Sequence, residues 1–391
     1  MSDSRQLAWA YLSRCIEGPD RELQRLLSAG EDVEKIVHGI KNRESWLGPL
    51  LKTTQTRASV DYAREDLEAI KAIGGRLLTP DSPEWPTEQF DAAFGFAASG
   101  QSDCIRSMQD DAVAPHALWV KGIPLSELLA QAVAIVGTRA VSNYGREATR
   151  QLVQELVAHQ WTIVSGGALG VDAVAHSVAL ETGGRSIAVA ACGLDKTYPA
   201  AHRGLFRQIS QHGALVSEYP PGISPARHRF LTRNRLVAAL TSGTVVVEAA
   251  WRSGALNTLT WAEGLGRVAM AVPGPITGVG SLGCHERIRT GRAQLVVSAD
   301  EIRELLSAIG ELDVAGQYEF DFAPSPVQSL SRNEMRVYDA TSAQARLTAD
   351  IAADAGLSVA LTVHLLVELQ KRQLICREGD GWKRIESEAE D

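Results

Sequence analysis

Seven short apolar runs alternate with helix-length segments between Val133 and Ala299, and this alternation constrains the fold more than any other feature of the chain. Continuous apolar strands separated by helices are typical of a parallel sheet that helices cover on both faces. The sequence therefore predicts an α/β fold with a doubly wound, mostly parallel, extended Rossmann-like sheet. The runs are VAIVG at 133, WTIVSGG at 161, SIAVAAC at 186, ALVSEYP at 214, TVVVEAA at 244, VAMAVPG at 268 and QLVVSA at 294.

The segments on either side of these runs predict further domains. Apolar positions at helical spacing predict a small helical domain over residues 1–75, followed by the Rossmann-like domain over 76–310. Residues 311–330 contain two prolines and no clear periodicity, so we expect a linker there. Three helical segments and a short hairpin predict a winged helix over 331–391.

Basic charge is concentrated in the predicted sheet. The whole chain has a formal net charge of −8, yet residues 133–299 hold 16 basic and 9 acidic residues, which gives +7. Residues 331–391 hold 8 basic and 11 acidic residues. Because local potential decides where a polyanion binds, the central domain is the expected site for one.

The stretch SPARHRFLTRNRL, from Ser224 to Leu236, places four arginines and a histidine around one phenylalanine. No acidic residue lies between Glu218 and Glu248. Guanidinium groups bind phosphate in a bidentate way, and an aromatic ring among them can stack on an unpaired base. The composition suits single-stranded nucleic acid, although a solvated basic helix face would have the same composition.

Two glycine-rich turns, GTR at 137–139 and SGG at 165–167, follow the first two runs. Backbone N–H groups at such turns and at the helix starts behind them can bind an anion. Glycines that only permit a tight turn are the simpler explanation for either turn alone, but Arg139 and Ser165 add side-chain donors. We expect both turns at one edge of the sheet.

Motifs for metal sites and for common enzymes are weak or absent. The five cysteines stand singly without a CxxC pair, and GxxxxGK[ST], HExxH and GxSxG do not occur. Asp172 and His176 could share a helix face, but the helix dipole explains the first and pairing with it explains the second. Glu248 ends a predicted strand, and its role stays open. We expect no metal and no cofactor.

A literal GxGxxG occupies residues 278–283, and Asp300 follows at a distance suited to a ribose ligand. This pattern would indicate a dinucleotide site. Pro273 and Pro275, however, place an extra loop between the strand and the first glycine, whereas the dinucleotide fingerprint needs that glycine at the end of the strand. The sequence therefore disfavours this interpretation.

These turns, together with YPAAH at 198–202, SEYPPG at 217–222, RNRL at 233–236 and AVPG at 271–274, resemble the DprA/Smf family of DNA-processing proteins. The resemblance spans the central domain, while the terminal domains match in general type. It implies a bacterial cytoplasmic protein of natural transformation that binds incoming single-stranded DNA and forms a homodimer. It also implies that the protein helps to load the RecA recombinase while single-strand-binding protein is displaced, without catalytic turnover.

Carried over by position, the resemblance implies that Phe230 stacks on a base while Arg139 and Arg227 hold the flanking phosphates. Family members usually carry an apolar residue where Arg287 stands, near the surface expected to form the dimer. The full set of implied DNA-binding residues is Arg139, Ser165, Gly166, Gly167, Arg227, Phe230, Arg233, Asn234 and Arg235.

An enzyme is the alternative interpretation. Related Rossmann-like domains cleave nucleoside monophosphates at the glycosidic bond, as nucleoside monophosphate phosphoribohydrolases, using a carboxylate near a glycine-rich phosphate turn. Glu248 and Arg235 would be the candidates here. That group typically shows a PGGxGT turn, whereas the matching region of this chain has Ser253 and Gly254.

Overall fold

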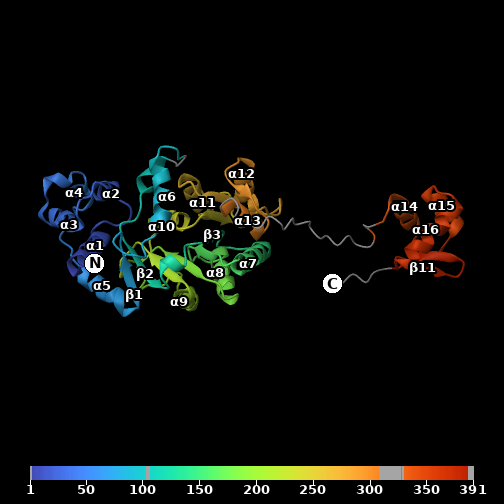
Figure 1. Ribbon diagram of the computed structural model, residues 1–391, viewed down its shortest axis with the longest axis horizontal. Coiled ribbons are helices and arrows are strands. Elements are labelled where there is room, and N and C mark those ends of the chain that lie inside the picture. Colours follow the sequence, from blue (N-terminus) through green and yellow to red (C-terminus); the bar gives the residue numbers. More distant parts are fainter. Residues whose placement is uncertain (1, 103–105, 308–326, 328–329, 386–391) are drawn as a thin grey trace. The chain divides into compact units, whose positions relative to one another are not determined.

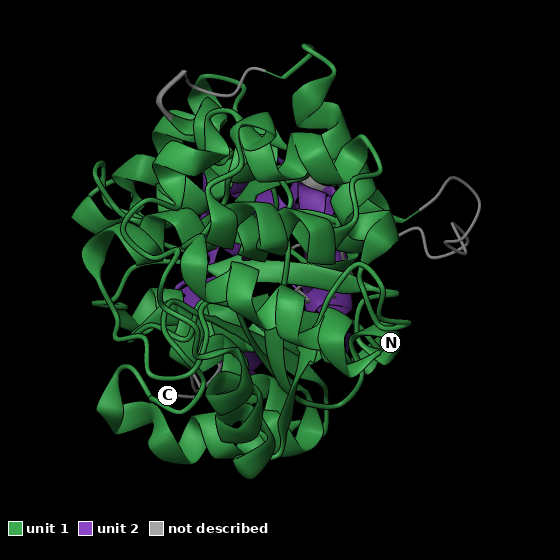
Figure 2. Cartoon of the chain, turned by 90° about the vertical axis from the view of Figure 1, so that its left-hand side faces the viewer, with its two compact units in different colours: residues 1–312 green, residues 313–391 purple. Residues whose placement is uncertain are grey.

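The computed structural model describes residues 2–102, 106–307, 327 and 330–385. The chain divides into two compact units, residues 1–312 and 313–391 (Figures 1 and 2). The predicted linker, residues 311–330, lies outside the described residues apart from Val327 and Leu330.

A nine-stranded sheet forms the centre of the first unit, in the order β1-β2-β6-β5-β4-β3-β7-β8-β9. Strands β3 to β9 pair in parallel, and β2 and β1 extend the β6 edge antiparallel. The mostly parallel, doubly wound sheet is therefore confirmed, while β1 and β2 were not predicted. The strands are β1 (Gly75–Leu78), β2 (Leu118–Gly122), β3 (Ala132–Val136), β4 (Thr162–Ser165), β5 (Ser186–Ala190), β6 (Ala214–Ser217), β7 (Gly243–Val246), β8 (Val268–Ala271) and β9 (Gln294–Leu295).

Helices cover both faces of this sheet, which explains why its strands are apolar throughout. Ala134 and Val136 pack on one face with α6 (Thr87–Ala98), α10 (Arg227–Ala239), α11 (Ala255–Gly264) and α12 (Leu282–Arg289). Val133 and Ile135 pack on the other face with α7 (Asn143–Ala158), α8 (Val171–Glu181) and α13 (Ala299–Leu306). Further along that face lies α9 (Arg203–His212).

The N-terminal helices belong to the same unit as the sheet. Their apolar side chains form one cluster with Trp119 of β2 and Leu215 of β6. The indole Nε1 of Trp119 donates to Oγ of Ser13 at 2.9 Å, so α1 is fixed directly to a strand. These helices are α1 (Asp3–Cys15), α2 (Arg21–Ser28), α3 (Val33–Asn42), α4 (Leu50–Thr53) and α5 (Ala63–Ala72).

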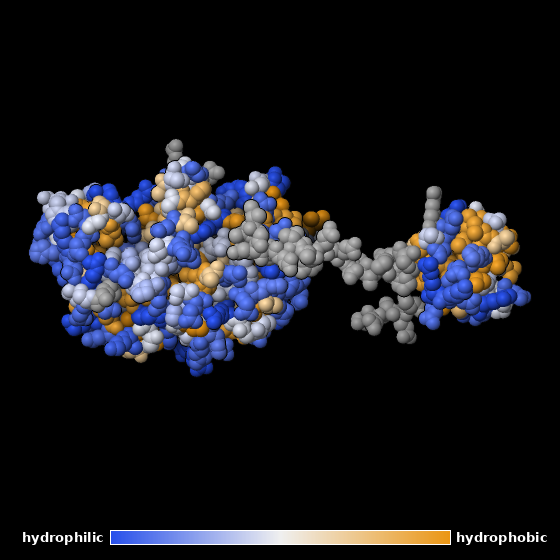
Figure 3. Space-filling view, in the orientation of Figure 1, coloured by the Kyte–Doolittle hydropathy of each residue, from blue (hydrophilic) through white to orange (hydrophobic). Residues whose placement is uncertain are grey.

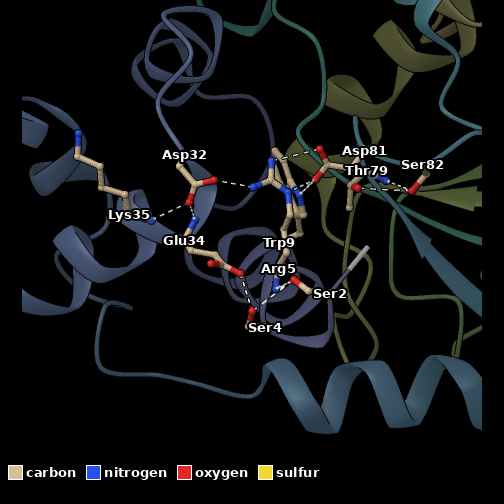
Figure 4. Close-up of polar contacts among 10 residues, drawn as sticks. All are labelled: Ser2, Ser4, Arg5, Trp9, Asp32, Glu34, Lys35, Thr79, Asp81 and Ser82. Atoms are coloured by element: carbon tan, nitrogen blue, oxygen red, sulfur yellow. Dashed lines mark hydrogen bonds and ion pairs between the residues drawn. The ribbon is translucent and has the colours of Figure 1, made fainter.

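Arg5 of α1 joins three segments of the N-terminal region (Figure 4). Its Nε and Nη2 donate to the two carboxylate oxygens of Asp81, after β1, at 2.7 and 3.2 Å. Its Nη1 donates at 2.6 Å to Asp32, the residue that caps α3. Trp9 also donates to Asp81, at 2.7 Å. Fork-shaped guanidinium contacts of this kind fix orientation, so α1 is held in register with both α3 and the end of β1.

The second unit has its own core, in which Val337, Ile351, Leu366 and Trp382 pack together. Its helices and strands lie where we predicted a winged helix, an assignment that stays a prediction. The elements are α14 (Arg332–Ala340), α15 (Thr348–Ala355), α16 (Val359–Lys371), β10 (Arg346–Leu347), β11 (Ile375–Glu378) and β12 (Gly381–Arg384).

Within the described ranges, no individual helix combines the length and hydropathy that a membrane span requires, and α15 and α16 meet those criteria only as a pair bent by 103°. In the same residues, Cys15, Cys192, Cys284 and Cys376 are free, and no group of three or more metal-ligating side chains comes together.

Candidate nucleic-acid interface

A pocket of about 720 Å³ lies at the carboxyl ends of β3 and β4. From β3 the chain winds outward to β4, β5 and β6, then crosses back to β7 on the other side of β3. The crevice outside the strands at such a reversal is the usual ligand site of open α/β sheets. Both glycine-rich turns, the first turns of α10 and the loop between β7 and α11 contribute to its walls. The sheet edge expected from the sequence therefore carries a large pocket.

Three arginines line the pocket with exposed side chains: Arg139 after β3, Arg227 at the start of α10 and Arg252 in the β7–α11 loop. None of their guanidinium groups forms a hydrogen bond or an ion pair with another described residue. A phosphate could therefore bind them without first breaking an internal ion pair.

Arg229 shows the contrast within the same helix. Its Nε lies 2.5 Å from a carboxylate oxygen of Glu17, and its side chain is only 15% exposed. Arg57 binds the second oxygen of the same carboxylate at 2.6 Å. The guanidinium of Arg229 is therefore held by an acidic residue of the N-terminal region, and Arg229 does not line the pocket.

Phe230 lies in the pocket wall with its ring half-buried. The guanidinium carbon of Arg139 lies 5.9 Å from the centroid of this ring. The centroid of the Tyr198 ring lies 5.3 Å from that of Phe230, with an angle of 49° between the two ring planes. Cationic and aromatic groups thus meet at one place, which is the combination that single-stranded nucleic acids bind.

The second turn is partly occupied by an internal carboxylate. The N–H of Ala168 donates to Asp172 at 3.2 Å, and burial raises the pKa of this carboxyl group. Ser165 is fully buried and its hydroxyl donates to the carbonyl of Ile135 at 2.7 Å. Gly166 lines the pocket, and Gly167 lines a smaller adjoining cavity. Gly166 is therefore partly accessible at the pocket, whereas Gly167 is buried and the Ser165 hydroxyl bonds within the sheet.

The RNRL segment of α10 sends its side chains in different directions, because successive helical residues are turned by about 100°. Asn234 lines the pocket and its amide donates to Asn257 at 3.0 Å. Arg233 also lines it, but its buried guanidinium donates to the carbonyl of Gly166 at 2.6 Å and to that of Val189. Burial lowers the pKa of Arg233.

Arg235 does not reach the pocket. Its side chain is fully buried, and Nη2 lies 2.6 Å from the carboxylate of Glu218. Its Nε donates to the carbonyl of Asp111 at 3.0 Å, and its guanidinium lies over the ring of Phe94. These contacts make Arg235 part of the core between α10 and α6.

Among the pocket residues that the family resemblance did not imply, Tyr198 and Arg252 have side chains suited to nucleic acid. Each carried a usable signal: Tyr198 belongs to the YPAAH motif, and Arg252 is a basic residue that follows a strand at its carboxyl end. Neither sequence signal predicts that the side chains of Tyr198 and Arg252 contribute to the same pocket as α10.

The catalytic candidates have internal partners. Oε2 of Glu248 accepts the N–H of Ser142, the residue that caps α7, at 3.0 Å. The Glu248 carbonyl accepts the N–H of Thr138 at 2.7 Å, so this residue supports the turn that carries Arg139. Glu248 is therefore a structural residue of the β3–α7 turn.

His176 lies fully buried in α8, with Nδ1 2.7 Å from Oγ of Ser186, and burial lowers its pKa to about 3. Neither ring nitrogen bonds Asp172, so the expected pairing of these two residues is wrong.

The GxGxxG segment is also explained by packing. A Cβ on Gly280 would lie 2.3 Å from a carboxylate oxygen of Glu248, so the loop needs a glycine to pass this side chain. The N–H of Gly283 donates to the carbonyl of Ala249 at 2.8 Å. The glycines fix the loop against the end of β7.

Comparison with known proteins gives consistent matches. The family model of DNA recombination-mediator protein A matches residues 76–307. A Mycobacterium tuberculosis chain that carries the name DNA processing protein DprA is 43% identical over 395 residues, which cover 100% of this chain and 97% of the relative. The DprA of Streptococcus pneumoniae is 42% identical over 189 residues, covering 48% of this chain and 66% of the relative. An X-ray structure of the S. pneumoniae protein aligns with a TM-score of 0.61 and 28% identity, over 78% of this chain and 99% of that one.

Proposed function

The chain belongs to the DNA recombination-mediator protein A (DprA/Smf) family, and we propose that its pocket at the β3–β4 edge binds single-stranded DNA. The observation that carries this proposal is the set of three exposed arginines without internal partners, Arg139, Arg227 and Arg252, around the half-buried ring of Phe230. The arginines would bind successive phosphates, and the ring would stack on a base.

The pocket suits a single strand better than a duplex. Its aromatic rings lie in a concave wall, where only an unpaired base could reach them, since the bases of a duplex are stacked inside the helix. Within the implied set, we assign direct contacts to Arg139, Gly166, Arg227, Phe230 and Asn234. Ser165, Gly167, Arg233 and Arg235 would act through the structure that they support.

Family membership also supports a role in recombination with further partners. We propose that the DNA-bound protein helps to load RecA while single-strand-binding protein is displaced, in the cytoplasm and during natural transformation. We assign no catalytic step to it. The alternative of a nucleotide-cleaving enzyme is not favoured, because both of its candidates, Glu248 and Arg235, are engaged in internal contacts.

We propose that the protein forms a homodimer and that the edge of the sheet at β9 is its interface. The side chains of Ile276 and Val279 are 88% and 71% exposed in the loop before α12, and Leu295 of β9 is half exposed. Apolar surface is visible where α12 and α13 lie (Figure 3). Arg287 does not present a free charge to this region, because it is mostly buried against Glu263 and Thr260.

For the second unit we propose a protein-contact role within a winged-helix fold. Residues 331–391 hold 8 basic and 11 acidic residues, which is a poor balance for a firm grip on phosphates.

A mobility-shift comparison of single-stranded oligothymidine with duplex DNA, each with and without RecA, tests the proposed function. We expect strong preference for the single strand and a ternary complex when RecA is added. Equal affinity for the duplex would contradict the single-strand assignment. Release of free base from nucleoside monophosphates, measured in parallel, would instead support the enzyme.

A further inference from the structure

Tyr198 presents the more accessible of the two aromatic rings at the pocket. Its side chain is 46% exposed, whereas Phe230 is half-buried with Arg139 and Tyr198 against its ring. Among the residues that the structure describes, none forms a hydrogen bond with the Tyr198 hydroxyl. A large aromatic side chain left open beside unpaired arginines is an unusual surface, and aromatic rings with one wet side are enriched where proteins bind partners.

The geometry limits what this ring can bind. A cavity beside it, between Tyr198, Gly167 and Leu169, has a volume of about 40 Å³. Since Tyr198 is 46% exposed, a nucleobase that stacks on it would lie on the part of the ring that is open to solvent.

The rings of Tyr198 and Phe230 also cannot share one base. Their planes differ by 49° at a centroid separation of 5.3 Å, and a flat base cannot lie parallel to both. Two neighbouring bases whose planes are inclined to each other could stack one on each ring. Arg139, which lies against Phe230, would then meet the backbone between them.

We propose that Tyr198 is a second base-stacking residue of the single-strand site, so that the pocket holds two successive bases at an angle. This inference rests on the proposed function and adds a residue and a strand geometry to it. The contact is indifferent to sequence, because every base has a π face.

The test compares Tyr198→Ala, Tyr198→Phe and the wild type for binding to fluorescein-labelled oligothymidine across a salt series. We expect Tyr198→Ala to weaken binding about 5- to 150-fold, the range of base-stacking losses, with an unchanged salt slope because no charge is removed. Tyr198→Phe keeps the ring and should bind as the wild type does. Tyr62→Ala is the matched control, because Tyr62 is 52% exposed but lies among the N-terminal helices outside the pocket.

A double-mutant cycle with Phe230→Ala separates stacking from packing. If Tyr198 stacks on its own base, Tyr198→Ala weakens binding further in the Phe230→Ala background. No further loss there would mean that Tyr198 only positions Phe230, and it would overturn the inference. An equal loss in Tyr198→Phe would overturn it as well, since the hydroxyl would then be responsible. If the wild type itself does not bind the oligonucleotide, the proposed function fails instead.

Discussion

The carboxylate of Glu17 lies 2.5 Å from Nε of Arg229, which joins the loop after α1 to the first turn of α10 across 212 residues of sequence. Arg229 stands between Arg227 and Phe230, the two residues of α10 that we place against DNA. Burial raises the pKa of Glu17, but hydrogen bonds from Arg229 and Arg57 outweigh it and hold the pKa at about 2. The N-terminal region is thus tied to the first turn of α10 without lining the pocket.

Glu17→Gln tests this connection. Because the partially buried carboxylate receives two guanidinium groups, we expect the free energy of unfolding at pH 7 to fall by about 1–2 kcal/mol. The folded-state pKa is lowered from its ordinary value of 4.5, so the contribution is complete above pH 4.5 and is lost as pH falls toward 2. Urea unfolding of both proteins between pH 7 and pH 3 should show their difference shrinking as the pH falls. A difference that stays constant over this range would mean that the carboxylate charge is not responsible.

Arg139→Ala and Arg227→Ala should each remove one phosphate contact. On a single strand, each neutralised phosphate contributes about 0.7 to the slope of log affinity against log salt, so each variant should flatten the slope by about this amount. Arg150→Ala is the control, since Arg150 of α7 is exposed and paired with Glu181 outside the pocket. Titration of oligothymidine at four salt concentrations measures the slopes, and unchanged binding in both pocket variants would sink the DNA assignment.

Arg235→Ala should instead act on stability. Removal of Arg235 leaves Glu218 buried without its partner, and breaking a buried ion pair in this way costs about 3–5 kcal/mol. Replacing both residues by apolar ones of similar volume, as in Arg235→Met with Glu218→Leu, should recover most of that loss. Chemical denaturation measures the effect. If the double variant folds stably but shows a flatter salt slope, Arg235 contacts DNA after all.

Gly166→Ala should disturb the pocket by displacing the side chain of Arg233, which lines it. A Cβ at this position would lie 2.4 Å from Nη1 of Arg233, whose guanidinium donates to two carbonyl groups and has little freedom to move. Overpacking of this kind costs about 1–3 kcal/mol, and we expect weaker DNA binding with it. Gly204→Ala in α9 is the matched control, because no atom lies within 4 Å of its added Cβ. Equal stability of the two variants would show that the Arg233 side chain can shift to make room for the added methyl group.

The sequence by itself determined the central sheet, because alternating apolar runs and helix-length segments leave few arrangements other than a parallel sheet with both faces covered. It also located the edge of the sheet where the pocket lies, since turns at the carboxyl ends of neighbouring parallel strands meet there. The strands β1 and β2 were not predicted, because their short segments become strands only through tertiary pairing, β2 with β6 and β1 with β2.

Only the tertiary structure decided which arginines of α10 face the pocket. The spacing of Arg227, Arg229, Arg233 and Arg235 places cations on several sides of one helix, and nothing local distinguishes them. Their roles depend on partners that are distant in sequence. Arg229 pairs with Glu17 and Arg235 pairs with Glu218. Arg233 donates to the carbonyl groups of Gly166 and Val189. Arg227 is left without a described partner, and Tyr198 reaches Phe230 only because the chain folds back over the same edge. Local periodicity sets the elements, whereas the availability of an arginine depends on which carboxylates and carbonyl groups the fold brings within reach.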